Sequence, residues 1–235
     1  MRGFALSSSS PKAAVFAGMA DIAKGLGSAH RIEIAEVLGQ GERNVEGIAR
    51  RVGLSVANTS QHLRLMRQYG LLTSRRDGKN VLYRLSDPAV VEILAALGKL
   101  AERQLAEVRE VVGGYFHDRD SMEPVSRDDL IGRVADGLVT VIDVRPEDEF
   151  RAGSLPSALN IPMNELAERL AELSPDHEII AYCRGPWCVM AFEAVALLRR
   201  HGMSARRLDG GFPEWKAAGL PVAEILQPGA RGSLA

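Results

Sequence analysis

The apolar pattern of this 235-residue chain changes its period near residue 124. Before that point apolar residues recur three and four positions apart, which is typical of amphipathic helices, apart from one strand-like stretch at 71–85. After it, β-branched runs such as 139–144 alternate with helical stretches, which is typical of a parallel sheet with helices on both faces. Two such patterns in a chain of this length predict two small domains.

The first half combines short helices, a tight turn and a hairpin. Gly53 ends one short helix, Ser55 caps the next, and Asp77-Gly78 between two strand-like runs is a strong hairpin signal. The expected elements are two helices within 13–38 separated by Gly25 and Gly27 with Ser28 as the second cap, helices over 44–52 and 56–69, strands over 71–76 and 80–85, and a helix from 87 to about 112. Helix 56–69 is expected to bury Val56, Leu63 and Met66. A basic hairpin directly after a helix-turn-helix predicts a wing, so we expect this half to bind DNA.

The last helix of this half is too long for so small a domain to cover its broad apolar face alone. Its apolar residues are Val90, Val91, Ile93, Leu94, Leu97, Leu100, Leu105 and Val108. A second copy of the chain can cover this face, so we expect a homodimer. Gly113-Gly114 and the polar run from His117 to Glu123 predict a linker.

The net charge of −1 hides an asymmetry. Residues 1–85 carry 13 Lys and Arg against 6 Asp and Glu, whereas residues 121–235 carry 12 against 17. A basic first third suits contact with nucleic-acid phosphates, although chance can produce an imbalance of this size. No apolar run approaches the ~20 residues of a membrane span, and no signal-peptide pattern surrounds the Ser-rich stretch Ser7–Ser10. We therefore expect a cytoplasmic protein that does not contact a membrane.

Both cysteines, Cys183 and Cys188, lie in one short loop of the second half. The expected elements of this half are strands over 139–144, 178–182 and 203–208 and helices over 165–173 and 189–201. A loop that joins a buried strand to a helix start points backbone N–H groups at its cysteine, and the helix N-terminus adds partial positive charge. Both effects, with Arg184 nearby, favour the nucleophilic thiolate of Cys183, and the same loop suits an anion such as thiosulfate.

The second half resembles the rhodanese family over about residues 124–222. The matching pieces are Asp143-Val-Arg145 with Glu149-Phe150, the stretch Gly153–Pro162, the cysteine loop, and Leu208-Asp-Gly-Gly211 with Trp215. The resemblance implies an α/β domain whose loop cysteine accepts sulfane sulfur as a persulfide and passes it to a nucleophile. Carried over, Cys183 is the catalytic nucleophile, and the anion-cradle loop consists of Arg184, Gly185, Pro186, Trp187 and Cys188.

Two positions depart from the pattern of that family. Ser154 stands where the family usually has His. Cys188 ends the loop where active sulfurtransferases have other residues, which puts simple thiosulfate turnover in doubt. Two interpretations of Cys188 stay open: a resolving thiol that attacks a Cys183 persulfide, or a small buried residue at a helix start.

The first half resembles the ArsR family of dimeric winged-helix repressors over about residues 14–112. The resemblance lies in Leu26–Leu38, in Ser60-Gln-His-Leu63 and in the stretches after Gly70 and Gly78. The outer side of helix 56–69 is expected to reach base edges, and basic side chains on the helix and wing to contact phosphates. The expected base contacts are Asn58, Thr59, Gln61 and His62, and the expected phosphate contacts are Arg64, Arg67, Arg75, Arg76 and Lys79. Open alternatives are a solvated helix face for Arg64 and Arg67 and a structural hydrogen bond for His62.

The metal-sensing residues of many such relatives are missing from this sequence. Helix 44–52 has no Cys and the last helix of the first half has no His, so we expect no metal site and no cofactor. Asp143, Arg145 and Glu149 are expected to form a structural ion-pair network rather than a catalytic group.

The sequence therefore predicts a DNA-binding transcriptional regulator, a repressor by resemblance, whose activity is linked to sulfur, persulfide or redox chemistry at Cys183. Its expected partners are a double-stranded DNA operator, a second copy of the chain and a small sulfur donor or oxidant. Two alternatives stay open: an active thiosulfate or persulfide sulfurtransferase tethered to a DNA-binding domain, and a domain that binds or reduces an oxyanion such as arsenate. The expected boundaries are a disordered tail at 1–12, the DNA-binding and dimerisation domain at 13–112, a linker at 113–123, the rhodanese-like domain at 124–224 and a C-terminal tail at 225–235.

Overall fold

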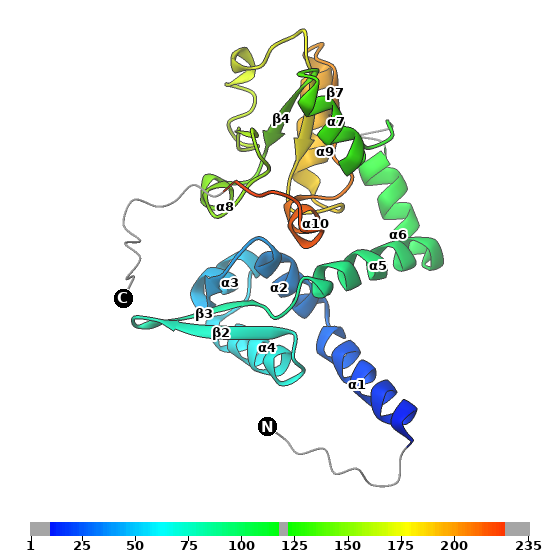
Figure 1. Cartoon of the computed structure of the whole chain (residues 1–235), viewed down its shortest axis with the longest axis vertical. Helices are drawn as coiled ribbons and strands as arrows, with labels where there is room; N and C mark the ends of the chain where they lie inside the picture. Colours follow the sequence, from blue (N-terminus) through cyan, green and yellow to red (C-terminus); the bar gives the residue numbers. More distant parts are fainter. Residues whose placement is uncertain (1–9, 118–121, 224–235) are drawn as a thin grey trace. The chain divides into compact units, whose positions relative to one another are not determined.

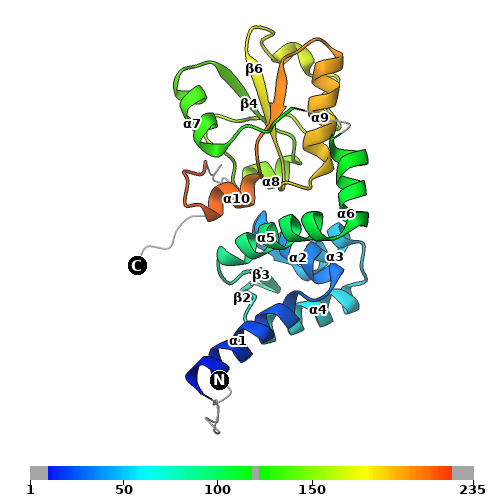
Figure 2. The same cartoon turned by 90° about the vertical axis from the view of Figure 1, so that its right-hand side faces the viewer.

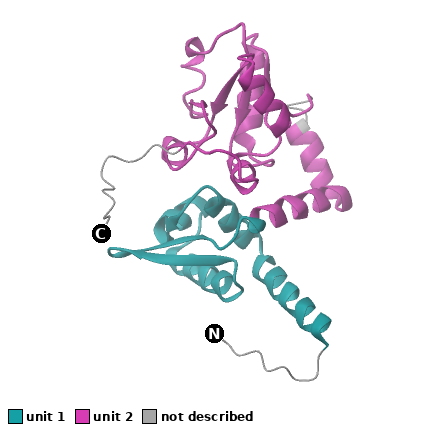
Figure 3. Ribbon diagram, viewed as in Figure 1, with its two compact units in different colours: residues 1–90 teal, residues 91–235 magenta. Residues whose placement is uncertain are grey.

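The computed structural model of the chain describes residues 10–117 and 122–223. It divides into two compact units, Met1–Val90 and Val91–Ala235, which Figure 3 shows in different colours. Most of the two predicted tails and residues 118–121 of the predicted linker lie outside the described residues. Within the described ranges, no helix is both long and apolar enough to cross a membrane.

Unit 1 consists of four helices, a small antiparallel sheet and the start of a fifth helix among its described residues. The elements are α1 (Pro11–Leu26), α2 (Ala29–Gly39), β1 (Arg43–Asn44), α3 (Val45–Val52), α4 (Val56–Gln68), β2 (Leu72–Asp77), β3 (Asn80–Leu85) and the first residues of α5 (Ala89–Gln104). The sheet order is β1-β3-β2, and the β2–β3 hairpin extends beyond the helices (Figure 1). Our sequence analysis missed β1, because a two-residue strand has too little pattern to predict it.

The helix-turn-helix has the two caps that its sequence predicts, at Gly53 and Ser55, and a further cap at Asn44. The Asn44 side chain accepts a hydrogen bond from the N–H of Gly47 at 2.9 Å, and Ser55 accepts one from Asn58 at 3.2 Å. Gly53, between the two helices, has φ +66°, a left-handed conformation that ends a helix and that favours glycine. These local interactions fix the start of α4, the second helix of the motif.

The buried stripe of α4 begins at Thr59, three residues after the predicted Val56. Leu63 and Met66 are fully buried, but Val56 is 45% exposed, so its predicted inward position is wrong. Thr59 is the buried residue of the first turn instead. The stripe therefore runs through positions 59, 63 and 66, spaced by four and three residues, as one helix face requires.

Unit 2 contains a four-stranded parallel sheet with helices on both faces. Its elements after residue 122 are α7 (Arg127–Ala135), β4 (Val139–Asp143), α8 (Glu147–Arg151), β5 (Leu159–Asn160), the short 3₁₀ helix η2 (Leu170–Glu172), β6 (Glu178–Tyr182), α9 (Val189–Arg200), β7 (Ala205–Arg207) and α10 (Phe212–Ala217). The strand order is β5-β4-β6-β7, with all neighbours parallel. Figure 2 shows α9 on one side of the sheet and α7 and α10 on the other. This confirms the predicted α/β architecture.

The helix predicted over 165–173 is wrong. The segment forms consecutive turns and η2, in which Glu165, Glu168 and Glu172 donate their N–H groups to carbonyls three residues earlier. Its apolar residues Leu166 and Leu173 nevertheless lie in the core under α9. An apolar spacing of three and four residues is satisfied by 3₁₀-type turns as well as by an α-helix, so the pattern alone did not separate the two.

The helix predicted from 87 to 112 is broken at Leu105. Its second part consists of α6 (Ala106–Val111) and a π-helical turn, η1 (Val112–His117). Arg109 donates hydrogen bonds to the carbonyls of Glu102 and Arg103, which the break leaves without helical partners. Gly113 and Gly114 lie within η1 rather than in a loop. The reason is that Val112 and Phe116 on either side of them are buried against Phe192 of α9, which holds the turn in place.

Candidate functional site

The outer face of α4 presents polar and basic side chains as predicted. Asn58, Gln61, Arg64 and Arg67 are exposed, and they follow Ser55, which fixes the helix start. Amide side chains near the start of such a helix have the donors and acceptors that read base edges, and the two arginines can reach phosphates. This surface is suited to a DNA major groove.

Thr59 is a correction to the predicted contact set. Its side chain is fully buried, and its hydroxyl donates to the carbonyl of Ser55 at 3.0 Å. The position faces the core stripe of α4 rather than the outer face, so Thr59 cannot touch a base.

His62 is half-buried beside a second histidine. Its ring centroid lies 5.8 Å from that of His30 on α2. Burial lowers the pKa of His62 from its usual 6.5, and the nearby Arg31 and His30 lower it further. The side chain is therefore mainly neutral at pH 7 and is placed to support α4 against α2 as much as to contact DNA.

The wing carries its basic residues on the exposed hairpin. Arg76 and Lys79 are exposed, whereas Arg75 donates to the Glu42 carboxylate at 2.8 Å. Glu42 also lies 3.9 Å from Arg84 on β3. The sequence analysis missed Glu42, which partly neutralises Arg75 and leaves Arg76 and Lys79 as the stronger candidates for phosphate contacts.

The cysteine loop joins β6 to α9 and is held by the turn after β7. Cys183 directly follows β6, and Cys188 is the N-cap residue of α9. The N–H of Phe212 donates to the Cys183 carbonyl at 3.0 Å. An added Cβ at Gly211 would lie 2.4 Å from both the Cys183 carbonyl oxygen and the Gly185 nitrogen. Only glycine fits this contact, which explains why the Asp-Gly-Gly turn belongs to the site.

The two cysteines are both buried and are not bridged. The Cys183 thiol donates a hydrogen bond to the Cys188 carbonyl oxygen at 3.6 Å. Backbone N–H groups of Gly185 and Ala191 point at Cys183, and those of Arg184 and Met190 point at Cys188. Each sulfur therefore sits in a small cradle of N–H donors.

The electrostatics of the pair differ from the prediction that the loop favours the Cys183 thiolate. Cys183 is completely buried, and burial raises its pKa well above 9.0. The hydrogen bond from Cys183 lowers the pKa of Cys188, and the N–H groups of Arg184 and Met190 lower it further, although burial opposes them. The negative charge of the pair is favoured on Cys188, because that residue lies at the start of α9.

Arg184 is not an isolated cation beside the thiols. It forms a two-pronged ion pair with Glu149 of α8, with N–O distances of 2.8 and 3.0 Å, and the Glu149 side chain is only 1% exposed. The predicted network extends to the cysteine loop. Asp143 and Arg145 form a fully buried pair at 2.6 Å, the negative charge of Glu149 also acts on Arg145, and Glu149 braces the loop through Arg184.

Trp187 connects the cysteine loop to α5 and η1. An added Cβ at Gly98 of α5 would lie 2.5 Å from Nε1 of Trp187, so the helix and the indole are in close contact. The Phe116 ring packs edge-on against Trp187 and against Phe192, with centroid distances of 6.1 and 4.8 Å. The sequence placed Trp187 in an anion cradle, but the side chain serves instead as the contact between loop and helix.

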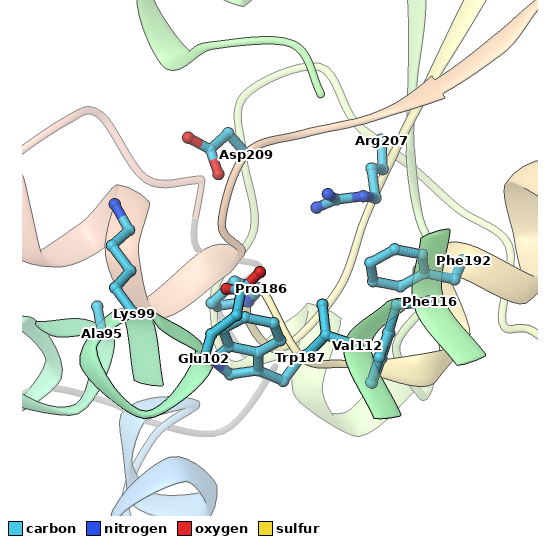
Figure 4. Close-up of a pocket in the computed structure, with 10 residues that line it drawn as sticks. All are labelled: Ala95, Lys99, Glu102, Val112, Phe116, Pro186, Trp187, Phe192, Arg207 and Asp209. Atoms are coloured by element: carbon cyan, nitrogen blue, oxygen red, sulfur yellow. The ribbon is translucent and has the colours of Figure 1, made fainter. Parts of the chain in front are cut away.

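A pocket of about 200 Å³ opens beside this contact. Figure 4 shows Lys99 and Glu102 of α5, Phe116 of η1, and Arg207 around the opening, with Trp187 at its floor. Neither cysteine lines it. Arg207 is also stacked on the Phe192 ring at 4.3 Å, which ties the pocket wall to α9.

Comparison with known proteins finds a match for each half. The model of the bacterial regulatory protein arsR family matches residues 28–74, and that of the rhodanese-like domain matches residues 126–218. The HTH-type transcriptional regulator Rv0324 of Mycobacterium tuberculosis is 40% identical over 213 residues, which cover 91% of this chain and 93% of the relative. A sulfurtransferase of Allochromatium vinosum is 31% identical over 100 residues, which cover 42% of this chain and 92% of that protein. The solved homodimeric winged helix-turn-helix DNA-binding domain of Mb0332 from Mycobacterium bovis is 32% identical, covers 43% of this chain and 94% of its own, and has a TM-score of 0.39.

Proposed function

Because this chain belongs to the ArsR-type DNA-binding transcriptional regulators that carry a rhodanese-like domain, we propose that sulfur chemistry at Cys183 and Cys188 sets its affinity for operator DNA. In this proposal the protein is a repressor, and its signal is a small persulfide or polysulfide. The observation that carries it is the direct contact of the cysteine loop with α5 through Trp187.

The proposed DNA contacts combine the outer face of α4 with the wing. Asn58 and Gln61 read base edges, and each well-placed amide–base pair contributes about 1–3 kcal/mol of discrimination. Basic side chains position the helix on the phosphates and make the affinity dependent on salt. These phosphate contacts are Arg64, Arg67, Arg76 and Lys79, with a smaller contribution from Arg75.

The proposed homodimer is supported by apolar side chains that the single chain leaves exposed. On α1, Val15, Phe16 and Met19 are each more than half exposed. On α5, Ile93, Leu97 and Leu100 are 37%, 42% and 49% exposed along one helix face. Burial of this much apolar surface is favourable at about 25 cal/mol per Å² of apolar area, and a second copy of the chain is the partner that offers the same surface.

The coupling route runs from the thiols through the loop to α5. A change of bonding at Cys188 moves the loop that carries Trp187, and Trp187 has no free space toward Gly98. Because α5 also carries part of the exposed apolar face, a shift of α5 alters the proposed dimer and with it the spacing of the two α4 helices.

The main alternative is an active sulfurtransferase, which the relative of that name from Allochromatium vinosum supports. A turnover enzyme must expose its persulfide to both donor and acceptor, whereas the Cys183 residue here has no exposed surface. Repeated turnover with thiosulfate and a thiol acceptor would favour the enzyme. A single stoichiometric modification favours the regulator.

The test of the proposal measures sulfur loading and DNA affinity on the same samples. The full chain, Cys183→Ser and Cys188→Ser are each treated with polysulfide, and binding to a DNA fragment selected from a random pool is followed by fluorescence anisotropy. We expect the dissociation constant of the wild type to change at least fivefold on loading and that of both variants to change less than twofold. Sulfur loading of the wild type with unchanged DNA affinity would overturn the proposed function.

A further inference from the structure

The pocket of about 200 Å³ beside Trp187 has an aromatic floor, and the proposed sulfur switch assigns no ligand to it. The floor consists of the Trp187 indole, Val112 and Phe116 of η1, and Phe192 of α9. Phe116 packs edge-on against both of the other rings, so the three rings hold one another in place without a ligand. Such a preformed surface suits an apolar group, and aromatic rings also make favourable contacts with the sulfur of a thioether.

Four charged side chains, two of each sign, surround the opening of this pocket. They are Lys99 and Glu102 of α5, Arg207 of β7, and Asp209 in the turn after β7. In the view of Figure 4 their charges alternate in sign around the opening. Among the described residues, the side chains of Lys99, Glu102 and Asp209 form no ion pair or hydrogen bond with one another or with other residues. The opening therefore offers a ligand charged groups of both signs.

The mixture of charges indicates the class of ligand. A simple anion in the pocket would be repelled by Glu102 and Asp209. A simple cation would be repelled by Lys99 and Arg207. A small molecule that carries both a carboxylate and an ammonium group matches both pairs through charge-assisted hydrogen bonds, which are the stronger kind. The volume of the pocket is below the roughly 300–1,000 Å³ of sites for drug-sized ligands, so the occupant has the size of a single amino acid.

The pocket continues into a wider cavity of about 440 Å³ along the same face of α5. The two share four lining residues, which are Ala95, Lys99, Pro186 and Asp209. The wider cavity is also lined by Ala96, Ala217 and Ala218, whose methyl side chains leave room for a ligand to pass. A small molecule can therefore enter through the wider cavity and meet Lys99 and Asp209 before it reaches Trp187.

We propose that this pocket binds a free α-amino acid with an apolar side chain. The side chain of the ligand lies on the aromatic floor, and its carboxylate contacts Lys99 and Arg207. Its ammonium group contacts Glu102 and Asp209. The occupant touches both α5 and Trp187 of the cysteine loop, so it holds these two elements together. Binding here requires no reaction at either cysteine and is therefore independent of the proposed sulfur switch.

The first experiment tests whether both charged ends of the ligand are needed. The full chain is titrated with L-methionine and with L-phenylalanine by isothermal titration calorimetry. Each is compared with an amine that lacks the carboxylate, 3-(methylthio)propylamine or phenethylamine, and with an acid that lacks the ammonium group, 4-(methylthio)butanoate or 3-phenylpropanoate. We expect at least one amino acid to bind with saturation and its two analogues to bind at least tenfold more weakly. The proposal is wrong if neither amino acid binds, or if either analogue binds as tightly as its amino acid.

The second experiment removes one charge of the opening at a time. Lys99→Met and Asp209→Asn should each weaken the binding of the amino acid at least fivefold. Lys99→Met should not weaken the amine analogue, and Asp209→Asn should not weaken the acid analogue, because each analogue lacks the group that the substituted side chain contacts. The matched controls are Arg103→Met on α5 and Asp176→Asn before β6, which are exposed, lie outside the pocket lining and should bind like the wild type. Circular dichroism melting shows whether each variant remains folded, and equal weakening by the controls would contradict the proposal.

The third experiment locates the ligand in the chain. Amide hydrogen exchange is measured with and without a saturating concentration of whichever amino acid binds more tightly. We expect exchange to slow at least threefold in peptides of α5 and of the loop 184–188, because the occupant contacts both elements. Peptides of α7, which lies in the same unit but does not line the pocket, should not change. Protection of α7 alone, or of no peptide, would overturn the proposal.

Discussion

Helix α4, the second helix of the helix-turn-helix, and the cysteine loop differ in how their functional groups are held: those of α4 are exposed, whereas those of the loop contact one another. On α4 the groups proposed to contact DNA, such as Asn58 and Gln61, are exposed side chains on a helix whose position the core fixes. In the loop the groups act on one another: the Cys183 thiol donates a hydrogen bond to the Cys188 carbonyl oxygen, and Trp187 packs on α5. A substitution on the outer face of α4 should therefore remove only the DNA contact of that residue. A substitution in or beneath the loop should also alter the residues packed around it.

The largest effect on stability is expected from removing a fully buried ion pair beneath the loop. Asp143→Ala removes the carboxylate that accepts hydrogen bonds from the Arg145 guanidinium, whose side chain has no exposed surface. Loss of one partner of such a pair costs about 3–5 kcal/mol, so unit 2 should unfold at markedly lower urea concentration. Urea unfolding followed by tryptophan fluorescence measures the loss, because both tryptophans lie in this unit.

The matched control is an ion pair of the same kind on the surface. Glu147 and Arg151 form an i,i+4 pair on α8, but their side chains are 65% and 55% exposed. Glu147→Ala should cost less than about 1 kcal/mol, since water replaces the lost partner. Equal losses in the two variants would show that burial does not separate the pairs.

The comparison also explains which parts of the fold the sequence could predict. The helix-turn-helix, its caps at Ser55 and Gly53, and the hairpin at Asp77-Gly78 depend on interactions within a few residues, and the structure confirms them. The strands β4 and β6 also follow from their local runs of apolar residues. Where the period alone decided between two structures, as at 165–173, the prediction was wrong.

The misassigned site residues share a different cause. Thr59 is polar and lies between two predicted contacts, so only its place on the buried face of α4 excludes it from DNA. Glu149 is 35 positions from Arg184, and Gly98 is far along the chain from Trp187, so no local pattern connects either pair. Which of Cys183 and Cys188 has the lower pKa depends on how deeply each thiol is buried. The spacing of two cysteines in the sequence does not show this burial.

A second prediction separates Gln61 from Thr59, which are two positions apart on α4. Gln61→Ala should weaken binding to the selected DNA by about 1–3 kcal/mol and leave unfolding unchanged, because its side chain is exposed. Thr59→Val should lower stability and leave DNA affinity nearly unchanged. It removes the buried hydrogen bond from the Thr59 hydroxyl to the Ser55 carbonyl, which costs about 1 kcal/mol of unfolding free energy. Anisotropy titrations give the DNA affinity of each variant, and urea unfolding gives its free energy of unfolding.

If Thr59→Val weakens DNA binding as strongly as Gln61→Ala, the outer face of α4 is not the base-reading surface. The control for general phosphate binding is the same titration on unrelated DNA, in which Gln61→Ala should match the wild type.

A third prediction tests whether the loop and α5 act together. Gly98→Ala places a methyl group 2.5 Å from Nε1 of Trp187, so the indole must move. We expect sulfur loading at the cysteines to continue while the change in DNA affinity on loading falls from at least fivefold to below twofold, a loss of at least about 0.5 kcal/mol in coupling. Loading by mass spectrometry and affinity by anisotropy are measured together.

Gly113→Ala is the control for this variant. It adds the same methyl group to a helical glycine of the same unit, but nothing lies within 4 Å of the new Cβ. Its response to polysulfide should equal that of the wild type. A Gly98→Ala protein that keeps the full response would mean that Trp187 does not transmit the state of the loop.

The smallest expected effect concerns His62, the one predicted DNA contact that is half-buried and has a lowered pKa. Because burial disfavours its protonated form, the unfolded chain binds this proton more readily than the folded one. The stability that His62 contributes is therefore fully present above about pH 6.5, its unfolded value, and is lost as the pH falls through the lowered folded value. Amide hydrogen exchange of α4 peptides should speed up slightly between pH 7.0 and pH 5.5, after correction for the intrinsic rate, and His62→Gln should remove most of that change. An identical pH response in His62→Gln would show that His62 is not the group that titrates, and would place His62 with the exposed contacts Asn58 and Gln61.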